Sequence, residues 1–536
     1  MCFGEGKRKE APMKNGFIKI LLVVVLVCAM ATPAMAEKVL RWASQGDALT
    51  YDPMSQNEGP TITASRQIYE TLIIRNYRQE KEPCLATSWK VLDPKTWEFK
   101  LRQGIKYHDG TPFTAEDVVF SFKRAMSPTS EFKGYIPSVV DVKAIDNSTV
   151  HILTSGPNPI MPDQVTNIFI MSKKWCEKHN AVQPQNFKEK QEMYTVRNAN
   201  GTGPFKLELR EPDIKTTVVK NPTWWRLKEN PHNIDRIIYT PIANAATRVA
   251  ALLSGEVDFV LDPPFQDLAR ISASPNLKTQ QISQIRSIFY GLDQGSAELR
   301  SSNIKGKNPF KDKRVRQAIN MAVDRAAIQK VVMRGLSVPA AVVTAPGVHG
   351  YPRDLDKSLP PLDLEKAKKL LAEAGYPSGF EVALDVPNDR YNNDEAIGQA
   401  TVGMLGKIGI KVKLVAQSKS LHFPKVTKRN SDFYMLGWGV PTLDSAYVFS
   451  YLYQKDGQWN ATGYDNPRVN ELAKAINVET NLPKRDALIA DVWKMVYDDI
   501  VYIPLHHQVI VWAMKKNLEL PIDAQDAPQF RFGRIQ

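Results

Sequence analysis

The sequence predicts an α/β fold, and three observations support this prediction. The chain has 536 residues, more than a single hydrophobic core accommodates, so we expect two or three folding units. Strand-like and helix-like segments alternate along the chain. With 43% hydrophobic and 24% charged residues, the composition is that of a globular protein and not of a disordered one.

Short runs of alternating or mostly apolar residues predict the strands. They lie at residues 38–42, 97–101, 257–260, 380–386 and 411–415. The run at 97–101 alternates apolar and polar residues, which is typical of a strand buried on one face. Turn residues follow several of these runs, which sets their length.

Caps and helical periodicity predict the helices. Thr114 and Asp117 form a partial capping box. The clearest helix covers residues 363–374, where Asp363 is the N-cap and Gly375 follows the last turn. Further helices are predicted at residues 244–253 and 313–333, ending at Gly255 and Gly335, and at residues 395–408.

The N-terminal segment, residues 1–36, has the pattern of a cleavable signal peptide. Lys14 and Lys19 precede a short apolar run at residues 20–30, and Ala34-Met35-Ala36 is an A-x-A site, so the mature protein would begin at Glu37. The apolar run is shorter than a membrane-spanning helix requires. We therefore expect a periplasmic protein cleaved after Ala36; an uncleaved anchor is the alternative.

Two details of this segment stay open in the sequence. Met13 is an alternative start, because residues 1–12 do not resemble the beginning of a signal peptide. Cys28 would suit a lipoprotein, but Val27 stands before it where a small residue is usual, which favours the free form.

The charge pattern and the cysteines exclude some classes of function. The net charge is +13, but the basic residues alternate with acids even in the densest cluster, KDKRVR at 311–316, so we expect no nucleic-acid partner. Cys84 and Cys176 are the cysteines of the mature chain. Export permits a disulfide between them, which the sequence leaves undecided, and the lack of C-x-x-C spacing argues against a zinc or redox centre.

No local motif of a common enzyme class is found. The chain lacks G-x-S-x-G, H-E-x-x-H, Walker A and Rossmann glycine patterns. His506 and His507 are adjacent, and adjacent residues on a strand point to opposite faces, so they do not form a metal clamp. We expect no enzyme, no cofactor and no metal site.

Seven motifs, taken in order along the mature chain, resemble the family 5 (peptide/nickel-type) extracellular solute-binding proteins of ABC importers. The first and longest runs through residues 86–118 and contains DGTPFTAED at 109–117. The others are GTGPF at 201–205, NPTWW at 221–225, SGEVD at 254–258, VRQAI with AVDR at 315–325, a helix with GYP at 367–377, and GW at 437–438. Nearly all of these motifs also have a structural reading as turns or core, so they indicate the fold and not the ligand.

The resemblance implies a periplasmic-binding-protein type II fold (cluster C-like) with two lobes and three domains. Domain I would comprise residues 37–60, 200–285 and 485–536, domain II residues 61–199, and domain III residues 286–484. The hinge would pass near residues 283–289 and again near residues 483–486. Ligand would be enclosed between domains I and III, and closure of the lobes would signal occupancy.

Similar dipeptide-binding proteins hold the ligand carboxylate with an arginine and its ammonium with an aspartate, both on domain III. The resemblance places Arg390 at the arginine position, and guanidinium suits a carboxylate. The aspartate position holds Pro441, which carries no charge. Asp444 is either its replacement or the N-cap of a helix through residues 446–452, and the cap is favoured. A ligand with a carboxylate but no free amine is therefore an alternative to a peptide.

Other ligand-facing positions also follow from the resemblance. Trp438 and Gly437 would form a wall of the site, where indole offers a broad apolar face. Asn57 and Gly59 would pair main chain with an extended ligand. Tyr447 and His506 are weaker candidates on the same surfaces. A solvated arginine, a core tryptophan and a hydrogen-bonded strand histidine are the structural alternatives for Arg390, Trp438 and His506.

The implied function is capture of a peptide or other small solute, and its delivery to membrane permease subunits driven by two cytoplasmic ATPases. The protein would act as a monomer. The alternatives are a binder of nickel chelate, haem, opine or glycan on the same fold, a secreted peptidase, and a chaperone-like or adhesion protein.

Overall fold

The computed structural model describes residues 1–7, 37–186, 189 and 192–536. It has two units, Met1–Lys38 and Val39–Gln536, and all of the elements that follow belong to the second. The predicted signal segment, with Lys14, Lys19, Cys28 and the cleavage site after Ala36, lies outside the described residues. Within the described ranges, no helix has both the length and the apolar character needed to cross a membrane.

A large mixed sheet extends through the second unit. In the described part of the chain its order is β15-β14-β16-β12-β17-β11-β1-β10-β9-β8, with β13 beside β17. β1 lies parallel to β10 and β11, and β14 lies parallel to β15 and β16, whereas the other pairs are antiparallel. The strands are β1 (Val39–Ser44), β8 (Phe205–Glu211), β9 (Lys215–Lys220), β10 (Arg236–Pro241), β11 (Phe259–Val260), β12 (Leu277–Leu292), β13 (Ser337–Pro339), β14 (Glu381–Pro387), β15 (Lys411–Gln417), β16 (Phe433–Gly439) and β17 (Tyr502–Lys515).

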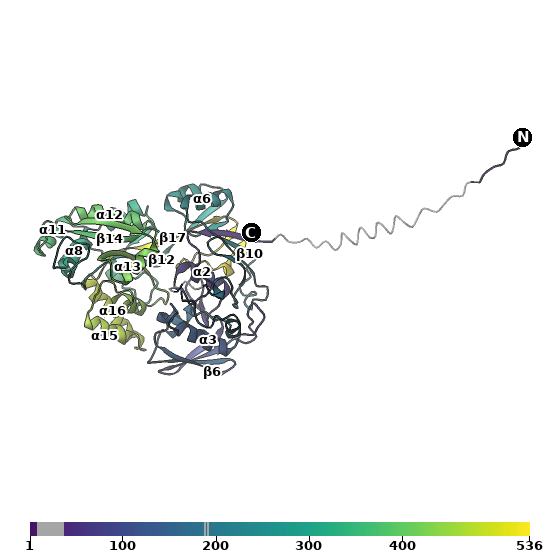
Figure 1. Ribbon diagram of the computed structural model, residues 1–536, viewed down its shortest axis with the longest axis horizontal. Coiled ribbons are helices and arrows are strands. Elements are labelled where there is room, and N and C mark those ends of the chain that lie inside the picture. The colour runs from purple at the N-terminus through teal and green to yellow at the C-terminus, as the bar shows by residue number, and fades with distance from the viewer. Residues whose placement is uncertain (8–36, 187–188, 190–191) are drawn as a thin grey trace. The chain divides into compact units, whose positions relative to one another are not determined.

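Two long strands, β12 and β17, belong to both halves of this sheet. Residues 277–283 of β12 pair with residues 509–515 of β17, next to β11, and residues 286–292 of β12 pair with β16. The ladder between β12 and β17 is irregular between Ser283 and Ser287. In Figure 1 the two strands lie between β14 and α12 (Asp394–Gly406) on one side and β10 on the other. The first expected crossing therefore coincides with an irregular point of the ladder.

The second expected crossing lies at residues 483–486. Those residues form the first turn of α16 (Leu482–Asp498), an uninterrupted helix that packs on α15 (Pro467–Ile476). The second chain segment shared by both halves of the sheet is β17, near residues 507–509. Pairing with a distant strand decides this position, and local sequence carries no signal for it.

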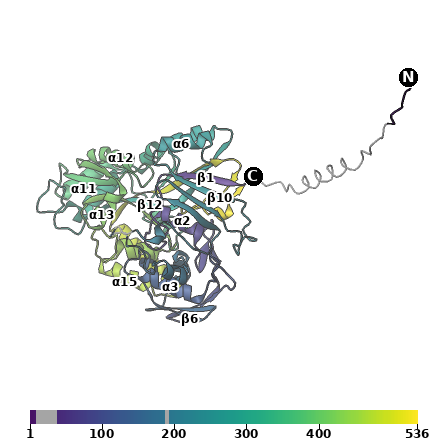
Figure 2. The same ribbon diagram turned by 45° about the vertical axis from the view of Figure 1, so that its right-hand side comes forward.

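A smaller antiparallel sheet, in the order β4-β5-β7-β6, carries α3 (Ala115–Met126) on one face. α3 and β6 lie close together in both views (Figures 1 and 2). The predicted capping box is present, because the Thr114 backbone N–H donates to Asp117 Oδ2 at 2.8 Å. The strands are β4 (Ala86–Asp93), β5 (Thr96–Leu101), β6 (Val139–Asp146) and β7 (Thr149–Thr154).

The helix predicted at residues 313–333 is broken. α8 (Lys313–Ala322) ends at Val323, and a short turn, α9 (Arg325–Ala327), and a π-helical turn, η7 (Ile328–Val332), follow. The buried Arg325 guanidinium donates to the carbonyl oxygens of Asn320 and Val323, and Asp324 caps the next turn by accepting from Ala327 N–H at 2.8 Å. The same guanidinium donates to the distant carbonyl oxygens of Ala340 at 3.2 Å and Pro504 at 2.8 Å, so packing against other segments accompanies the break in the helical pattern.

The other predicted helices and strands are present with shifts of one or two residues. α11 (Leu364–Glu373) begins after the cap at Asp363 and ends before Gly375, whose φ of +91° is the left-handed conformation that glycine favours. α6 (Ala245–Ser254) ends in the same way at Gly255. The strand predicted at residues 257–260 is reduced to β11. The remaining elements are α2 (Gly59–Ile68), α4 (Met161–Gln164), α5 (Lys173–Lys178), α7 (Leu268–Ser272), α10 (Arg353–Lys357), α13 (Lys419–Thr427), α14 (Ser445–Val448), β2 (Ile73–Arg75), β3 (Lys81–Pro83), β18 (Leu518–Glu519) and β19 (Arg534–Ile535).

Two of the sequence motifs meet at the buried carboxylate of Glu70. It accepts hydrogen bonds from Thr202 at 2.8 Å, from Trp224 Nε1 at 3.0 Å and from Trp225 Nε1 at 2.8 Å. A buried carboxylate needs such donors, because burial without them is costly. These motif residues therefore satisfy a buried acid of the fold.

Candidate functional site

Gly437, near the end of β16, is the point where several of the candidate residues meet. Its carbonyl oxygen accepts a hydrogen bond from Tyr391 Oη at 3.3 Å and from Arg286 Nη1 at 3.5 Å. A Cβ atom at position 437 would lie 2.6 Å from both Tyr391 and Ile288, so only glycine fits there. The predicted ligand-wall glycine thus lets the Tyr391 side chain lie against the strand.

Two arginines lie near this point. Arg286 belongs to β12 and pairs in register with Gly439, whereas Arg390 follows β14 and precedes α12, with its guanidinium 5.3 Å from the centre of the Tyr391 ring. In the parts of the chain that the structure describes, neither side chain has a carboxylate within 4.0 Å. Both are partly accessible. Two cations without acidic partners are unusual when they are partly buried, and they favour an anion as a third partner.

The electrostatics of Arg286 support this interpretation. Burial, and then the charge of Arg390, lower the pKa of Arg286 to about 10. The charge of Arg390 therefore raises the cost of ionising Arg286. A bound carboxylate would offset that cost, and guanidinium can hold it through two parallel hydrogen bonds.

Two carboxyl groups also face these arginines. Glu58 is the N-cap of α2 and accepts from Thr61 N–H at 2.8 Å; burial raises its pKa, and the charges of Lys419 and Arg390 oppose that rise. Asp526, near the C-terminus, accepts from Trp512 Nε1 at 2.9 Å, and burial raises its pKa to about 7. The site thus combines cations and acids that come from distant segments.

Aromatic side chains form one wall beside Gly437. Trp438 is 8% exposed and stacks on Tyr447, with ring centres 5.8 Å apart, and on the edge of Trp459 at 5.9 Å. Tyr447 in turn packs on Tyr451 at 4.4 Å. The indole N–H of Trp438 has no hydrogen-bond partner among the described residues. Because a buried indole usually donates a hydrogen bond, this N–H is a donor that a ligand or water could use.

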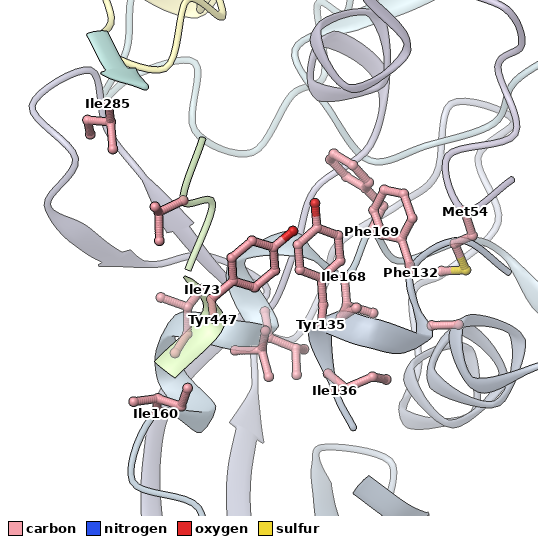
Figure 3. Packing of buried hydrophobic residues seen from close by; sticks show 14 of the residues in the cluster. Met54, Ile73, Phe132, Tyr135, Ile136, Ile160, Ile168, Phe169, Ile285 and Tyr447 are labelled. Carbon is pink, nitrogen blue, oxygen red and sulfur yellow. The ribbon is translucent and has the colours of Figure 1, made fainter. Parts of the chain in front are cut away.

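Tyr447 also reaches the part of the chain that carries α3. Its ring stacks on Tyr135 with centres 6.1 Å apart and planes 13° apart, and Figure 3 shows the two rings side by side. Tyr135 Oη donates to Asn57 Oδ1 at 2.6 Å. Gly59 begins α2 two residues later, is exposed, and has no atom within 4 Å of the position of a Cβ. Three predicted positions, Asn57, Gly59 and Tyr447, are thereby brought to one region.

Asp444 has the structural role that the sequence favoured. It is the N-cap of α14, accepting from Ala446 N–H at 2.9 Å, and both carboxylate oxygens accept from Arg485 at 2.8 and 2.7 Å. His349 Nδ1 lies 2.9 Å from Oδ2. Asp444 is 3% exposed. Its hydrogen-bonding capacity is used within the protein, so it does not replace the acid missing at Pro441.

Three other predicted residues are buried away from solvent. His506 is 1% exposed, and burial lowers its pKa to about 3, so this histidine is neutral and inaccessible. Both of its ring nitrogens lack partners among the described residues, whereas the neighbouring His507 contacts Ser287 and Asp356. Cys84 and Cys176 are buried free thiols in this structure, so the disulfide that the sequence left open is not formed in it.

Arg286 and Asp526 were not found from the sequence. Arg286 looks like any arginine on an alternating strand, and Asp526 lies in a polar turn near the C-terminus. Each becomes noticeable only because its expected counter-charge is missing in the folded chain, and no local pattern reports that.

Comparison with known proteins identifies a family and a fold. The family model of bacterial extracellular solute-binding proteins, family 5, matches residues 80–460. The glutathione-binding protein GsiB of Escherichia coli K12 is 26% identical over 523 residues, which cover 95% of this chain and 96% of GsiB.

Solved structures also match over almost the whole chain. DppA of Helicobacter pylori in complex with the peptide STSA gives a TM-score of 0.79 at 24% identity, covering 92% of this chain and 97% of DppA. AgaA of A. tumefaciens R10 in complex with agropinic acid gives 0.78 at 25% identity, covering 93% and 99%. The predicted type II binding-protein fold is confirmed.

Proposed function

Because the chain belongs to the family 5 extracellular solute-binding proteins, we propose that it captures a small peptide-like solute with at least two carboxylates for an ABC importer. Family 5 proteins are periplasmic, work with ABC transporter permeases and bind peptide ligands. The observation that carries the choice of ligand is the pair Arg286 and Arg390, two partly buried cations beside Gly437 without acidic partners in the described chain.

The names of the ligands of two similar proteins indicate the size of the solute. GsiB is named for glutathione, a tripeptide with two carboxylates, and AgaA holds agropinic acid, which is also a small carboxylic acid. We infer that Arg390 and Arg286 bind separate carboxylates, with Trp438 and Tyr447 as the apolar wall beside them. An opine-like acid is the second candidate, because it would meet the same two cations.

The rest of the transport cycle follows from the family. After removal of the signal segment at Ala36, the monomer would bind solute between its lobes, close and dock on the permease, while the ATPases act in the cytoplasm. Domain I (37–60, 200–285, 485–536), domain II (61–199) and domain III (286–484) remain the proposed division. No covalent bond of the solute changes, so labelled peptides should not be turned over.

The test is a binding measurement on the mature protein. Isothermal titration with glutathione, a dipeptide series and agropinic acid should identify at least one ligand, and native mass spectrometry of the purified protein should show any solute that co-purifies. Arg390→Ala should weaken binding of that ligand by more than about tenfold, as expected for a buried charged hydrogen bond.

The matched control is Arg314→Ala, because Arg314 is an exposed arginine paired with Asp312. It should leave affinity unchanged. If Arg390→Ala and Arg286→Ala both bind like the wild type while remaining folded, the two arginines do not hold the ligand and the proposed carboxylate site is wrong.

A further inference from the structure

Asp526 lies in a C-terminal segment that is fixed against three elements of the fold. Ala524 accepts from the backbone N–H of Ile285 on β12 at 2.9 Å, and Gln525 Oε1 accepts from Arg66 on α2 at 3.1 Å. Trp512 of β17 donates to Asp526 Oδ1 at 2.9 Å. The attachment at Ile285 places Asp526 in the neighbourhood of the next residue, Arg286.

The carboxylate of Asp526 is only partly used by the protein. Its second oxygen, Oδ2, has no hydrogen-bond partner among the described residues and is not sealed from solvent. Asp526 also has a φ of +61°, a conformation that non-glycine residues adopt rarely and that an ordered segment must hold in place. A half-buried carboxylate with one free oxygen is a natural acceptor for a cation.

Asp526 and Arg286 influence each other without touching. Each lowers the cost of ionising the other, yet no nitrogen of Arg286 lies within 4.0 Å of the carboxylate. Opposite charges that influence each other without pairing leave room for a group that carries both charges. The ammonium and carboxylate of an α-amino acid lie side by side on one carbon atom, which matches this arrangement.

We propose that Asp526 receives the ammonium group of the ligand and, together with Arg286, forms a subsite for an α-amino-acid head, while Arg390 holds a second carboxylate. This rests on the proposed function. In similar dipeptide-binding proteins an aspartate at the position of Pro441 binds the ammonium. Here that role would belong to Asp526 in the C-terminal segment. Arg286 is in register with Gly439 of β16, so the subsite lies beside the strand that leads to Pro441.

Glu58 is the rival acceptor, because it also faces the arginines. Its Oε1 caps α2 through Thr61, and the charges that most favour its ionisation are those of Lys419 and Arg390. Glu58 is therefore nearer to the second carboxylate than to the amino-acid head. Binding of the ammonium by Asp526 and binding by Glu58 predict different results when each acid is neutralised.

The experiment compares ligands with and without the amine on three proteins. The probe pairs are glutathione with its des-amino form, and γ-glutamyl-alanine with glutaryl-alanine, measured by isothermal titration. The proteins are the wild type, Asp526→Asn and Glu58→Gln. Asparagine keeps an oxygen for Trp512 and tolerates φ above zero, and glutamine keeps the cap on α2, so both variants should fold; circular dichroism and thermal unfolding check this.

The wild type should bind the amine form of at least one pair about tenfold to a hundredfold more tightly than the des-amino form. Asp526→Asn should lose this preference by weakening only the amine form, and Glu58→Gln should keep it. Preference retained in Asp526→Asn, or lost only in Glu58→Gln, would overturn the assignment.

The remaining outcomes separate this inference from the proposed function. If the wild type binds both members of a pair equally, and Arg390→Ala weakens both, the proposed function stands and the role of Asp526 is refuted. If the wild type binds neither member of any pair, the proposed ligand class is refuted, and with it the subsite.

Discussion

Asp444 is buried and Asp526 is half-buried, and the two aspartates differ in how many hydrogen bonds the protein donates to their carboxylates. Asp444, at the start of α14, accepts hydrogen bonds from Arg485 with both oxygens and from the first turn of its helix. Asp526, in the C-terminal segment, accepts one hydrogen bond from Trp512. The first carboxylate is satisfied by the protein, whereas the second has a free oxygen beside an arginine.

This difference appears in the acidities. Burial opposes ionisation of Asp444, but hydrogen bonds from His349 and Arg485 lower its pKa to about 2. Burial raises the pKa of Asp526 to about 7, and its one strong donor does not compensate. A carboxylate that the fold already satisfies stabilises the fold, and one that the fold leaves unsatisfied is available to a ligand.

The largest expected effect comes from a substitution that breaks the buried ion pair between Asp444 and Arg485. Asp444→Asn should lower the free energy of unfolding by about 3–5 kcal/mol, because it leaves the Arg485 cation buried without its anion. Urea denaturation at neutral pH measures this. Asp465→Asn, which breaks an exposed pair with Lys455, is the control and should cost less than about 1 kcal/mol. A similar small loss for both variants would mean that Asp444 is not a structural acid.

The next largest effect is the pH dependence of the stability that the Asp444–Arg485 pair contributes. Since the pKa of Asp444 is lowered in the folded state, its contribution to stability is present above about pH 4 and is lost as the pH falls toward 2. From pH 6 to pH 2.5, the difference in unfolding free energy between wild type and Asp444→Asn should shrink by about 2 kcal/mol. A difference that stays constant over this range would contradict the lowered pKa.

A third prediction concerns ligand affinity at Asp526. An ammonium binds the ionised carboxylate, so affinity for an amine-bearing ligand should fall about tenfold between pH 8 and pH 6, through the pKa of about 7. The charged groups that face Asp526 are Asp262, Asp523 and Arg286, and burial also raises the pKa of Asp262, to about 6.

Asp526→Asn separates these contributions, because Asp262 titrates in both proteins. The variant should lose most of the pH dependence for the amine ligand, and the des-amino ligand should show little of it in either protein. Titration calorimetry at pH 6, 7 and 8 measures both. An unchanged pH profile in the variant would assign the dependence to Asp262 or to another group.

The smallest expected effect is the contribution of Asp526, the acid with a free oxygen, to the free energy of unfolding. A raised folded-state pKa means that ionised Asp526 destabilises the ligand-free protein, increasingly as the pH rises from about 4 to 7. Asp526→Asn should therefore not lower the free energy of unfolding at pH 8 below that of the wild type. A loss of about 2 kcal/mol or more would show that Asp526 is structural, as Asp444 is.

The sequence predicted the roles of some candidate residues and not of others, because some roles depend on nearby residues and others on distant ones. The cap at Asp444 was favoured correctly, because an N-cap is a contact over two or three residues. Its partner Arg485 is 41 residues away, and the partners of Asp526 lie 14 residues away or farther, at Trp512 and Arg286. The family resemblance made His506 a weaker ligand candidate, but its strand is central in the sheet and the side chain is buried.

By itself, the sequence determined the alternation of helices and strands, the helix ends at Asp363, Gly375 and Gly255, and the family resemblance, because these depend on contacts within a few residues or on motifs in order. The break at Val323, the pairing of β17 with both halves of the sheet and the partners of the charged groups came from tertiary contacts. Those depend on segments hundreds of residues apart, such as Ile285 and Ala524, whose approach no local pattern encodes.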